Sequence, residues 1–257
     1  MLLAIAADNT NTKFALFEGE TLRHQWRAQT QAQKTADEYA VWLLQLMTFA
    51  KIDASKVAGA IISTVVPAAL FNIRLLCQKY FKTEPLVVGE GIDIGAKVAV
   101  DLPGEVGADR LVNTVAAFSS HGGPSIVVDF GTATSFDVVG RDGSFQGGVI
   151  APGINLSLEA LHNATAKLPR ISVAKPPSVI GKSTVPCMQS GVFWGYVGLI
   201  EGLVARIKTE MGGGAIKVVA TGGLAPLFAD STDVFDAIDA DLNFRGLRMI
   251  WDRNARR

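Results

Sequence analysis

The chain has 257 residues, of which 49% are hydrophobic, so it can bury one large core or two smaller ones. A single domain of this length is near the usual upper limit, and two domains are therefore expected. Lys and Arg together number 24, as do Asp and Glu, so the formal net charge is zero. No global field attracts nucleic acid or an anionic membrane, and we expect neither as a partner.

Cysteine and histidine residues are too scattered to suggest a metal site or a disulfide framework. Cys77 and Cys187 are isolated, and the three histidines lie far from one another in the sequence. The apolar start of the chain has no basic flank and breaks at Asp8, after too few residues for a signal peptide or a membrane span. We therefore expect a cytoplasmic protein.

The first predicted element is a β-hairpin over residues 3–17, in which an apolar strand runs through a small polar turn into a second strand. Small turn residues allow backbone N–H groups to converge on an anion, and hydroxyl groups can donate hydrogen bonds to it. An Asp at the end of a strand can hold a cation or a metal-bound water. This hairpin is a candidate phosphate-binding turn.

Strands and helices alternate after this hairpin. A capping box beginning at Thr35 predicts the start of a helix, and Pro67 suits the first turn of another that runs to about Phe81. Strands are predicted at Leu22–Arg27, Gly59–Ser63 and Leu86–Val88, of which Gly59–Ser63 is expected to be buried. This alternation indicates an α/β fold.

A carboxylate and a guanidinium follow at the start of a third predicted helix. Asp109 and Arg110 precede apolar residues with helical spacing. Asp109 could accept a proton while Arg110 steadies an anion. A carboxylate interacting with the helix dipole, beside an ordinary surface ion pair, explains the same pattern. The residues alone leave both interpretations open.

The second half of the chain repeats the plan of the first. Residues 125–139 form a second predicted hairpin, with Asp129 at the end of its first strand and Thr132 in its turn. Further strands are predicted at Phe145–Ile150 and Ile216–Val219, with helices at Leu156–Leu161 and Met188–Met211. Two facing hairpins of this kind could grip the β- and γ-phosphates of one nucleotide between two domains.

Taken in order, several motifs make the chain resemble the type III pantothenate kinases over essentially its whole length. They are the Asn9–Thr12 turn, Gly107–Arg110, Asp129–Thr134, Gly147–Gly153, Thr184 and Thr221–Gly223. The resemblance implies the fold of the superfamily of acetate and sugar kinases, heat-shock ATPases and actin. We expect an α/β protein of two ribonuclease-H-like domains, residues 1–118 and 119–257, with a nucleotide cleft between the domains.

The family's activity is transfer of the γ-phosphoryl group of ATP to the primary hydroxyl of pantothenate, giving 4'-phosphopantothenate in the first step of coenzyme A synthesis. Carried over by position, Asp109 resembles the general base. Gly107, Ala108, Arg110 and Thr184 join Asp109 as expected pantothenate contacts. The expected ATP contacts are Asp8, Asn9, Thr10, Asn11, Thr12, Lys13 and Thr132. Asp129 matches the residue that holds a monovalent cation, potassium or ammonium. ATP with Mg²⁺ and a homodimer are also implied.

The first hairpin departs from the family pattern Asp-x-Gly-Asn-Thr. With Asn9 and Thr10 in register, Ala6 replaces the metal-side Asp and Asp8 replaces the glycine. Sliding the match by two residues makes Asp8 the metal-side carboxylate on the same strand face, and Thr10 then replaces the glycine. We favour the unshifted register, in which Mg²⁺·ATP loses its carboxylate anchor.

Two functions therefore remain open. One is a working pantothenate kinase with an altered metal site. The other is a catalytically weak or silent relative with a ligand-binding or regulatory role. A sugar or acetate kinase would share the cleft but gives no reason for the Gly107–Arg110 stretch.

Overall fold

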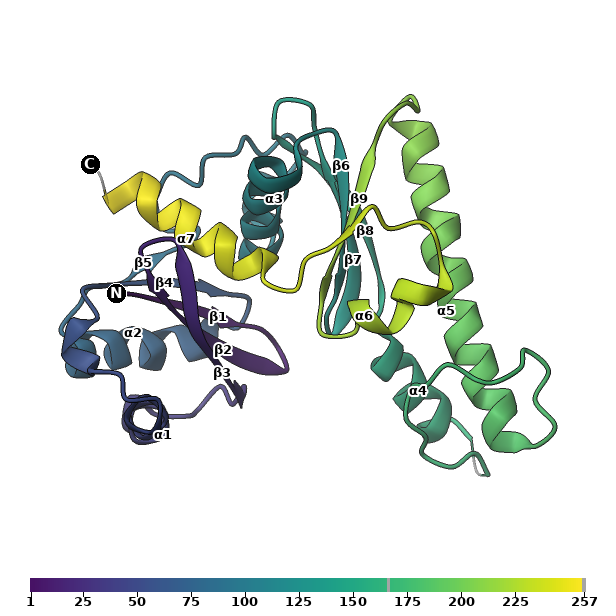
Figure 1. Ribbon diagram of the computed structural model, residues 1–257, viewed down its shortest axis with the longest axis horizontal. Coiled ribbons are helices and arrows are strands. Elements are labelled where there is room, and N and C mark those ends of the chain that lie inside the picture. Colours follow the sequence, from purple (N-terminus) through teal and green to yellow (C-terminus); the bar gives the residue numbers. More distant parts are fainter. Residues whose placement is uncertain (166, 256–257) are drawn as a thin grey trace. The chain divides into compact units, whose positions relative to one another are not determined.

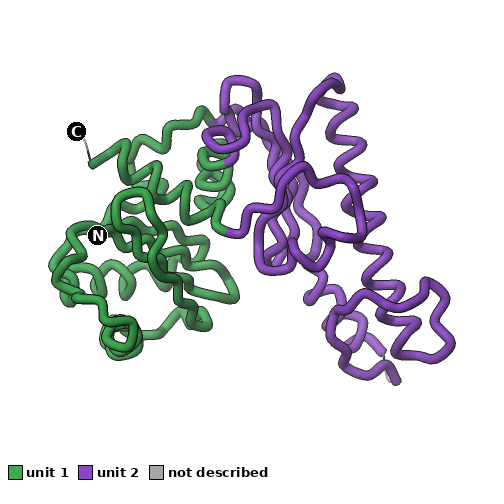
Figure 2. Tube along the Cα trace, viewed as in Figure 1, with its two compact units in different colours: residues 1–97, 101–116, 241–257 green, residues 98–100, 117–240 purple. Residues whose placement is uncertain are grey.

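The computed structural model describes residues 1–165 and 167–255. They form two compact units (Figure 2). Unit 1 comprises residues 1–97, residues 101–116 and the described residues from 241 onward, and unit 2 comprises residues 98–100 and 117–240. The change from one unit to the other at residues 116/117 lies near the domain boundary expected at 118/119. The residues from 241 onward, expected in the second domain, group with the first half of the chain.

Unit 1 is built on a five-stranded sheet with the order β3-β2-β1-β4-β5 (Figure 1). Its strands are β1 (Leu2–Ala7), β2 (Asn11–Glu18), β3 (Thr21–Gln29), β4 (Gly59–Thr64) and β5 (Leu86–Val87). The pairs β1–β2 and β2–β3 are antiparallel, whereas β1–β4 and β4–β5 are parallel. Every residue of β1 is buried, because helices cover both faces of the sheet.

The helices of unit 1 are α1 (Ala36–Phe49), α2 (Pro67–Phe81), α3 (Ala108–His121), whose residues from 117 onward belong to unit 2, and α7 (Leu242–Ala255). Side chains of α1 and α2 pack with Leu3 and Ile5 on one face of the sheet. Val112 of α3 and Leu247 of α7 pack with Ala6 on the opposite face. Alternation along β1 therefore directs its even-numbered residues toward α3 and α7. Two short 3₁₀ turns, Ala54–Lys56 and Pro103–Glu105, complete the unit.

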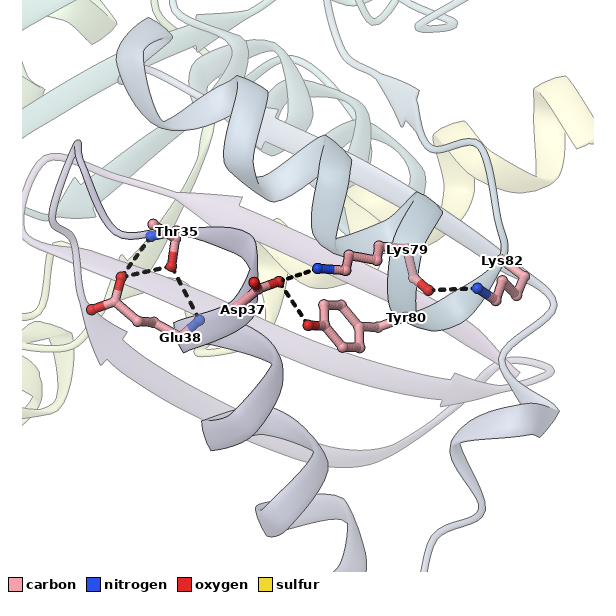
Figure 3. Close-up of polar contacts among 6 residues, drawn as sticks. All are labelled: Thr35, Asp37, Glu38, Lys79, Tyr80 and Lys82. Carbon is pink, nitrogen blue, oxygen red and sulfur yellow. Dashed lines mark hydrogen bonds and ion pairs between the residues drawn. The ribbon is translucent and has the colours of Figure 1, made fainter.

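Polar contacts fix α1 at its start and against α2 (Figure 3). Thr35 caps the helix: its hydroxyl accepts the Glu38 N–H at 3.3 Å, and the Glu38 carboxylate accepts the Thr35 N–H at 2.8 Å. One turn of α1 also contacts α2, because Asp37 accepts hydrogen bonds from Lys79 at 2.8 Å and from Tyr80 at 2.7 Å. The capping box predicted from the sequence is confirmed.

Unit 2 repeats the sheet of unit 1. Its strands are β6 (Ser125–Phe130), β7 (Ala133–Val139), β8 (Phe145–Pro152), β9 (Lys217–Gly222) and β10 (Ala237–Ile238). Their order, read from the β8 edge, is β8-β7-β6-β9-β10, and the pairing directions match those of β3-β2-β1-β4-β5. The two units therefore share one topology, which confirms the expected ribonuclease-H-like fold of both halves.

The helices of unit 2 are α4 (Ile154–Asn163), α5 (Thr184–Glu210) and α6 (Ala225–Phe228), followed by a 3₁₀ turn at Ala229–Ser231. The long helix α5 packs its apolar side chains, Phe193 and Ile200 among them, against Val128 of β6. α4 lies beside the first turns of α5 (Figure 1). Among the described residues, no helix is long and apolar enough to cross a membrane.

Candidate active site

The candidate phosphate-binding turn between β1 and β2, residues 8–10, is called the first phosphate turn. It lies at the end of the sheet where the parallel strands β1 and β4 finish. The last ladder pair is Ala7 with Thr12, and the backbone N–H of Asp8 donates to the Asn11 carbonyl at 3.0 Å. Asn9 and Thr10 are exposed at the tip. The carboxyl ends of parallel strands are where α/β proteins usually bind ligands, so this turn is well placed for a phosphate.

The repeated topology gives an internal test of the register of this turn. In unit 2, Phe130 ends the parallel pairing of β6 with β9, and Asp129 comes one residue earlier. In unit 1, Ala7 ends the equivalent pairing of β1 with β4, and Ala6 comes one residue earlier. Ala6 thus occupies the position equivalent to Asp129. The repeat favours the unshifted register, in which Ala6 stands in the place of the missing carboxylate.

Asp8 occupies the position equivalent to Gly131 and is not isolated. Its Oδ2 atom lies 2.8 Å from Nζ of Lys13. Asp8 is not among the described residues with positive φ, so its side chain is accommodated at the turn without left-handed backbone strain. Lys13 is opposite Ala6 in the β1–β2 ladder and therefore leaves the sheet on the same face as Ala6 and Asp8.

Asp109 is in the first turn of α3, and its Oδ1 atom accepts the backbone N–H of Arg110 at 2.9 Å. Val112 lies three residues later and packs on the Ala6 face of the sheet. Side chains three residues apart share a helix face, so Asp109 is directed toward the same side of the sheet as Asp8. Within unit 1, Asp8 pairs with Lys13, and the charge of Asp8 also acts on Asp109.

The surroundings of Asp109 raise the pKa of its carboxyl group above the ordinary value for Asp. The largest cause is burial, which disfavours the charged form, and the negative charge of Asp8 acts in the same direction. The hydrogen bond from the Arg110 N–H and the positive charge of Arg110 oppose this shift. A carboxyl group with a raised pKa is better matched to accepting a proton near neutral pH than an exposed Asp.

Thr12, expected among the ATP contacts, lies on the other face of the sheet. Its side chain is fully buried. Its hydroxyl is 2.9 Å from the Thr30 hydroxyl and 3.3 Å from the Tyr39 hydroxyl. The hydroxyl of Thr12 therefore ties β2 to the end of β3 and to α1. Alternation along β2 accounts for this placement, because Thr12 and Lys13 point to opposite faces.

In unit 2, Asp129 lies against a glycine of the neighbouring strand. Gly222 has φ +90°, and a Cβ on it would lie 2.7 Å from Asp129 Oδ1 and 2.6 Å from the Phe130 carbonyl oxygen. A carboxylate and a carbonyl oxygen therefore gather beside a residue that has no side chain. Such oxygens are the ligands that hard cations take in proteins.

Residues 131 and 132, between β6 and β7, form the second phosphate turn, in which Thr132 is exposed. The Gly147–Gly153 segment contacts this turn. The backbone N–H of Gly153 donates to the Thr132 carbonyl at 3.1 Å, and a Cβ on Gly153 would lie 2.2 Å from that oxygen. Tyr196 of α5 supports the same loop by donating to the Pro152 carbonyl at 2.5 Å. Sequence reasoning missed Tyr196, because it sits within an apolar helix face.

Thr184 is the first residue of α5 and is exposed. It lies at the end of α5 that contacts α4 (Figure 1). Four large apolar side chains are also exposed in α4, in the segment before α5 and in its first turn: Leu156, Val179, Ile180 and Val185. Thr184 therefore belongs to a surface of unit 2 that is rich in exposed apolar groups.

Two units with one ribonuclease-H-like topology, each carrying a polar turn after its first strand, define the fold class of the acetate and sugar kinases, heat-shock ATPases and actin. The sequence model of one family, described as type III pantothenate kinase, matches residues 2–206. The chain is 60% identical to a type III pantothenate kinase from Paramagnetospirillum magneticum over 256 residues, covering 99% of this chain and 98% of that protein. The chain belongs to the type III pantothenate kinase family.

Solved structures support the fold. One neighbour is a protein from Campylobacter jejuni described as a Baf family transcriptional activator, with a TM-score of 0.62, 20% identity, and coverage of 99% of this chain and 100% of that chain. Another, from Sinorhizobium meliloti, is described as a 2-dehydro-3-deoxygalactonokinase, with a TM-score of 0.59, 11% identity, and coverage of 100% and 96%. At these identities the likeness concerns the fold alone. The family membership makes the chain an ATP-using phosphotransferase, and nothing in the comparisons favours a silent relative.

Proposed function

We propose that this chain transfers the γ-phosphoryl group of ATP to the primary hydroxyl of pantothenate with Asp109 as the general base. The observation that carries the assignment is the position of Asp109, half-buried at the start of α3 on the same side of the sheet as the first phosphate turn. A carboxylate held there can orient the attacking hydroxyl and accept its proton as the bond to phosphorus forms.

The proposed pantothenate contacts of unit 1 are those of the Gly107–Arg110 stretch, and Thr184 is a proposed contact of unit 2. Gly107 is needed for space, because a Cβ on it would lie 2.5 Å from Asp109 Oδ1. Arg110 can steady the carboxylate of pantothenate or a phosphoryl oxygen, since its guanidinium presents several donors in a fixed plane. The proposed ATP contacts are the turn residues Asn9, Thr10 and Asn11, with Asp8 and Lys13 beside them, and Thr132 of unit 2. The Thr12 side chain is left out because it is buried on the opposite face.

The proposed reaction involves two kinds of cation. Mg²⁺ would accompany ATP and neutralise charge on the transferring phosphoryl group. The fit of the first turn to Mg²⁺ is poor, because Ala6 has no oxygen ligand and Asp8 is paired with Lys13. The second turn fits a monovalent cation, potassium or ammonium, since Asp129 Oδ1 and the Phe130 carbonyl converge beside Gly222. Asp129 is therefore the proposed monovalent-cation ligand.

A homodimer is proposed as the working state. Exposed apolar side chains around Thr184 support this proposal, because a concentration of such groups on a protein surface commonly marks an interface. Burial of Leu156, Val179, Ile180 and Val185 against a second copy would cover them. Because ATP is a proposed substrate, the cytoplasm is the proposed location.

The reaction is tested by identifying its product. The purified chain is incubated with ATP, Mg²⁺, potassium and pantothenate, and the mixture is analysed by mass spectrometry and ³¹P NMR. A phosphomonoester of pantothenate is expected, in an amount equal to the ADP formed. ATP hydrolysis without this product, at the same rate with and without pantothenate, would reject the proposed function.

A further inference from the structure

The first phosphate turn contains an ion pair that spans the position of the missing carboxylate. Lys13 lies directly opposite Ala6 in the β1–β2 ladder, and opposite side chains in an antiparallel pair are about 5 Å apart at Cβ. A carboxylate at position 6 would therefore be the natural partner of Lys13. Ala6 provides none, and Lys13 instead reaches Asp8, the next residue on that strand face, with 2.8 Å between Nζ and Oδ2.

This pair changes the electrostatics expected for the turn. The charge of Asp8 by itself would repel a phosphate, whereas the Asp8–Lys13 pair has no net charge. Both groups remain accessible, because the side chains of Lys13 and Asp8 are 41% and 31% exposed. An ammonium group has three donors, so the contact of Lys13 with Asp8 does not by itself exclude a hydrogen bond to a phosphate oxygen.

We propose that Asp8 is a positioning residue that holds Lys13 at the phosphate turn, and that Lys13 directly supplies the positive charge that meets the phosphates of ATP. In this arrangement an ammonium group takes over part of the role that a metal-side carboxylate would otherwise fill by recruiting Mg²⁺. The inference rests on the proposed function, because it assumes that ATP phosphates occupy this turn. It assigns Asp8 no ligand role toward the metal.

Nucleotide binding measured by calorimetry tests this proposal without requiring turnover. ADP and a non-hydrolysable ATP analogue are titrated into the parent chain and its variants, with Mg²⁺ and again with EDTA. Loss of a charged hydrogen bond costs about 1.5–3 kcal/mol, so Lys13→Met should weaken binding about 10- to 100-fold in both conditions. Lys13→Arg should retain most of the affinity. Lys97→Met, at an exposed lysine of the same unit, is the matched control and should bind as the parent does.

A double-mutant cycle separates the role of Asp8 from that of Lys13. Asp8→Ala should weaken nucleotide binding less than Lys13→Met does. The combined Asp8→Ala and Lys13→Met variant should bind no more weakly than Lys13→Met alone, because Asp8 acts through Lys13. Thermal melting that stays close to that of the parent shows that each variant is folded.

The opposite result is expected if Asp8 is a metal ligand, as the shifted register would require. Lys13→Met would then remove a cation that competes with Mg²⁺, so binding in Mg²⁺ would tighten, and Asp8→Ala alone would abolish the difference between Mg²⁺ and EDTA. Either finding overturns the proposal, as does unchanged binding in Lys13→Met. These results leave the proposed function standing, whereas a parent chain that binds no nucleotide in either condition rejects both.

Discussion

The Asp109 carboxylate occupies the space that a side chain on Gly107 would fill. A Cβ on Gly107 would lie 2.5 Å from Asp109 Oδ1, so the Asp109 carboxylate would have to move, whereas Cγ1 of Val65, at 3.5 Å, would be in ordinary contact. Gly107 thus lets the proposed base sit at the start of α3, beside the segment that follows β4. This contact links the glycine of the Gly-Ala-Asp-Arg stretch to the chemistry of the aspartate.

Replacing Gly107 with Ala should displace the Asp109 carboxylate and lower kcat about 10- to 100-fold, because small misplacements of a reacting group are costly. Gly104→Ala is the matched control, since Gly104 is exposed and a Cβ there meets nothing within 4 Å. Steady-state kinetics with both substrates saturating measure the effect. Equal kcat values for the two variants would show that Gly107 does not serve the base.

Asp109→Asn should lower kcat about 10²- to 10⁴-fold while retaining pantothenate binding, because the amide cannot accept the proton. The same change should raise the melting temperature at neutral pH. Burial raises the pKa of Asp109, so the charged form destabilises the folded state, and that cost is absent at acidic pH, where the group is protonated. The gain in melting temperature should therefore shrink as the pH falls. A variant less stable than the parent at neutral pH would argue against this account of the carboxylate.

The pH dependence of kcat should change when Asp8 is replaced. A base with a raised pKa loses activity as pH falls through that pKa, so the acid limb should lie above the ordinary range for Asp. The negative charge of Asp8 is one cause of the raised pKa of Asp109. Asp8→Ala should therefore move the acid limb of kcat to lower pH, whatever its effect on the rate. Glu20→Ala, at a carboxylate 87% exposed, should leave the limb in place. An acid limb unmoved by Asp8→Ala would show that Asp109 does not control it.

Asp129→Ala should abolish activation by potassium or ammonium, because it removes the carboxylate oxygen of the proposed site beside Gly222. The rate with and without each cation is compared for this variant and for Asp233→Ala, a change at an exposed aspartate of the same unit. Size-exclusion chromatography checks that the oligomeric state is retained. A normal cation response in Asp129→Ala would place the cation elsewhere.

Restoring the family pattern at the first turn should raise activity. Ala6→Asp combined with Asp8→Gly supplies the metal-side oxygen and removes a side chain from the path of the phosphate. The carboxylate introduced by Ala6→Asp would also stand opposite Lys13, so that lysine keeps an acidic neighbour. Ala6→Asp alone should help less, and Asp8→Gly alone should not help, because it removes the carboxylate that Lys13 contacts. Loss of activity in the double variant, from an active parent, would reject the unshifted register.

Local signals in the sequence predicted much of this fold. The capping box at Thr35 and the proline at the start of α2 are confirmed within one residue, because they act through neighbouring residues. The short elements α6 and β10 were not predicted, since four and two residues give no usable period. The grouping of α7 with unit 1 was missed as well, because it depends on packing between segments far apart in the chain.

In the candidate site, too, features that depend on neighbouring residues were predicted and features that depend on strand pairing were not. The Gly107–Arg110 stretch and Asp129 were predicted as site residues from residue type and order, and they stay predictions. The Asp8–Lys13 pair was not, because it depends on the register of the hairpin. The contact between Gly222 and Asp129 depends on parallel pairing of β6 with β9, which no local pattern reveals. The burial of Thr12 could have been foreseen, since alternation places it on the face opposite to Lys13.

Asp109 is proposed as the base of a pantothenate kinase. A coupled assay of ADP formation with Mg²⁺ and potassium, run with and without pantothenate on the parent chain and on Asp109→Asn, tests it most directly. We predict ADP formation that depends on pantothenate in the parent and falls about 10²- to 10⁴-fold in the variant. Near-normal pantothenate-dependent turnover in Asp109→Asn, or none in the parent, would contradict the claim.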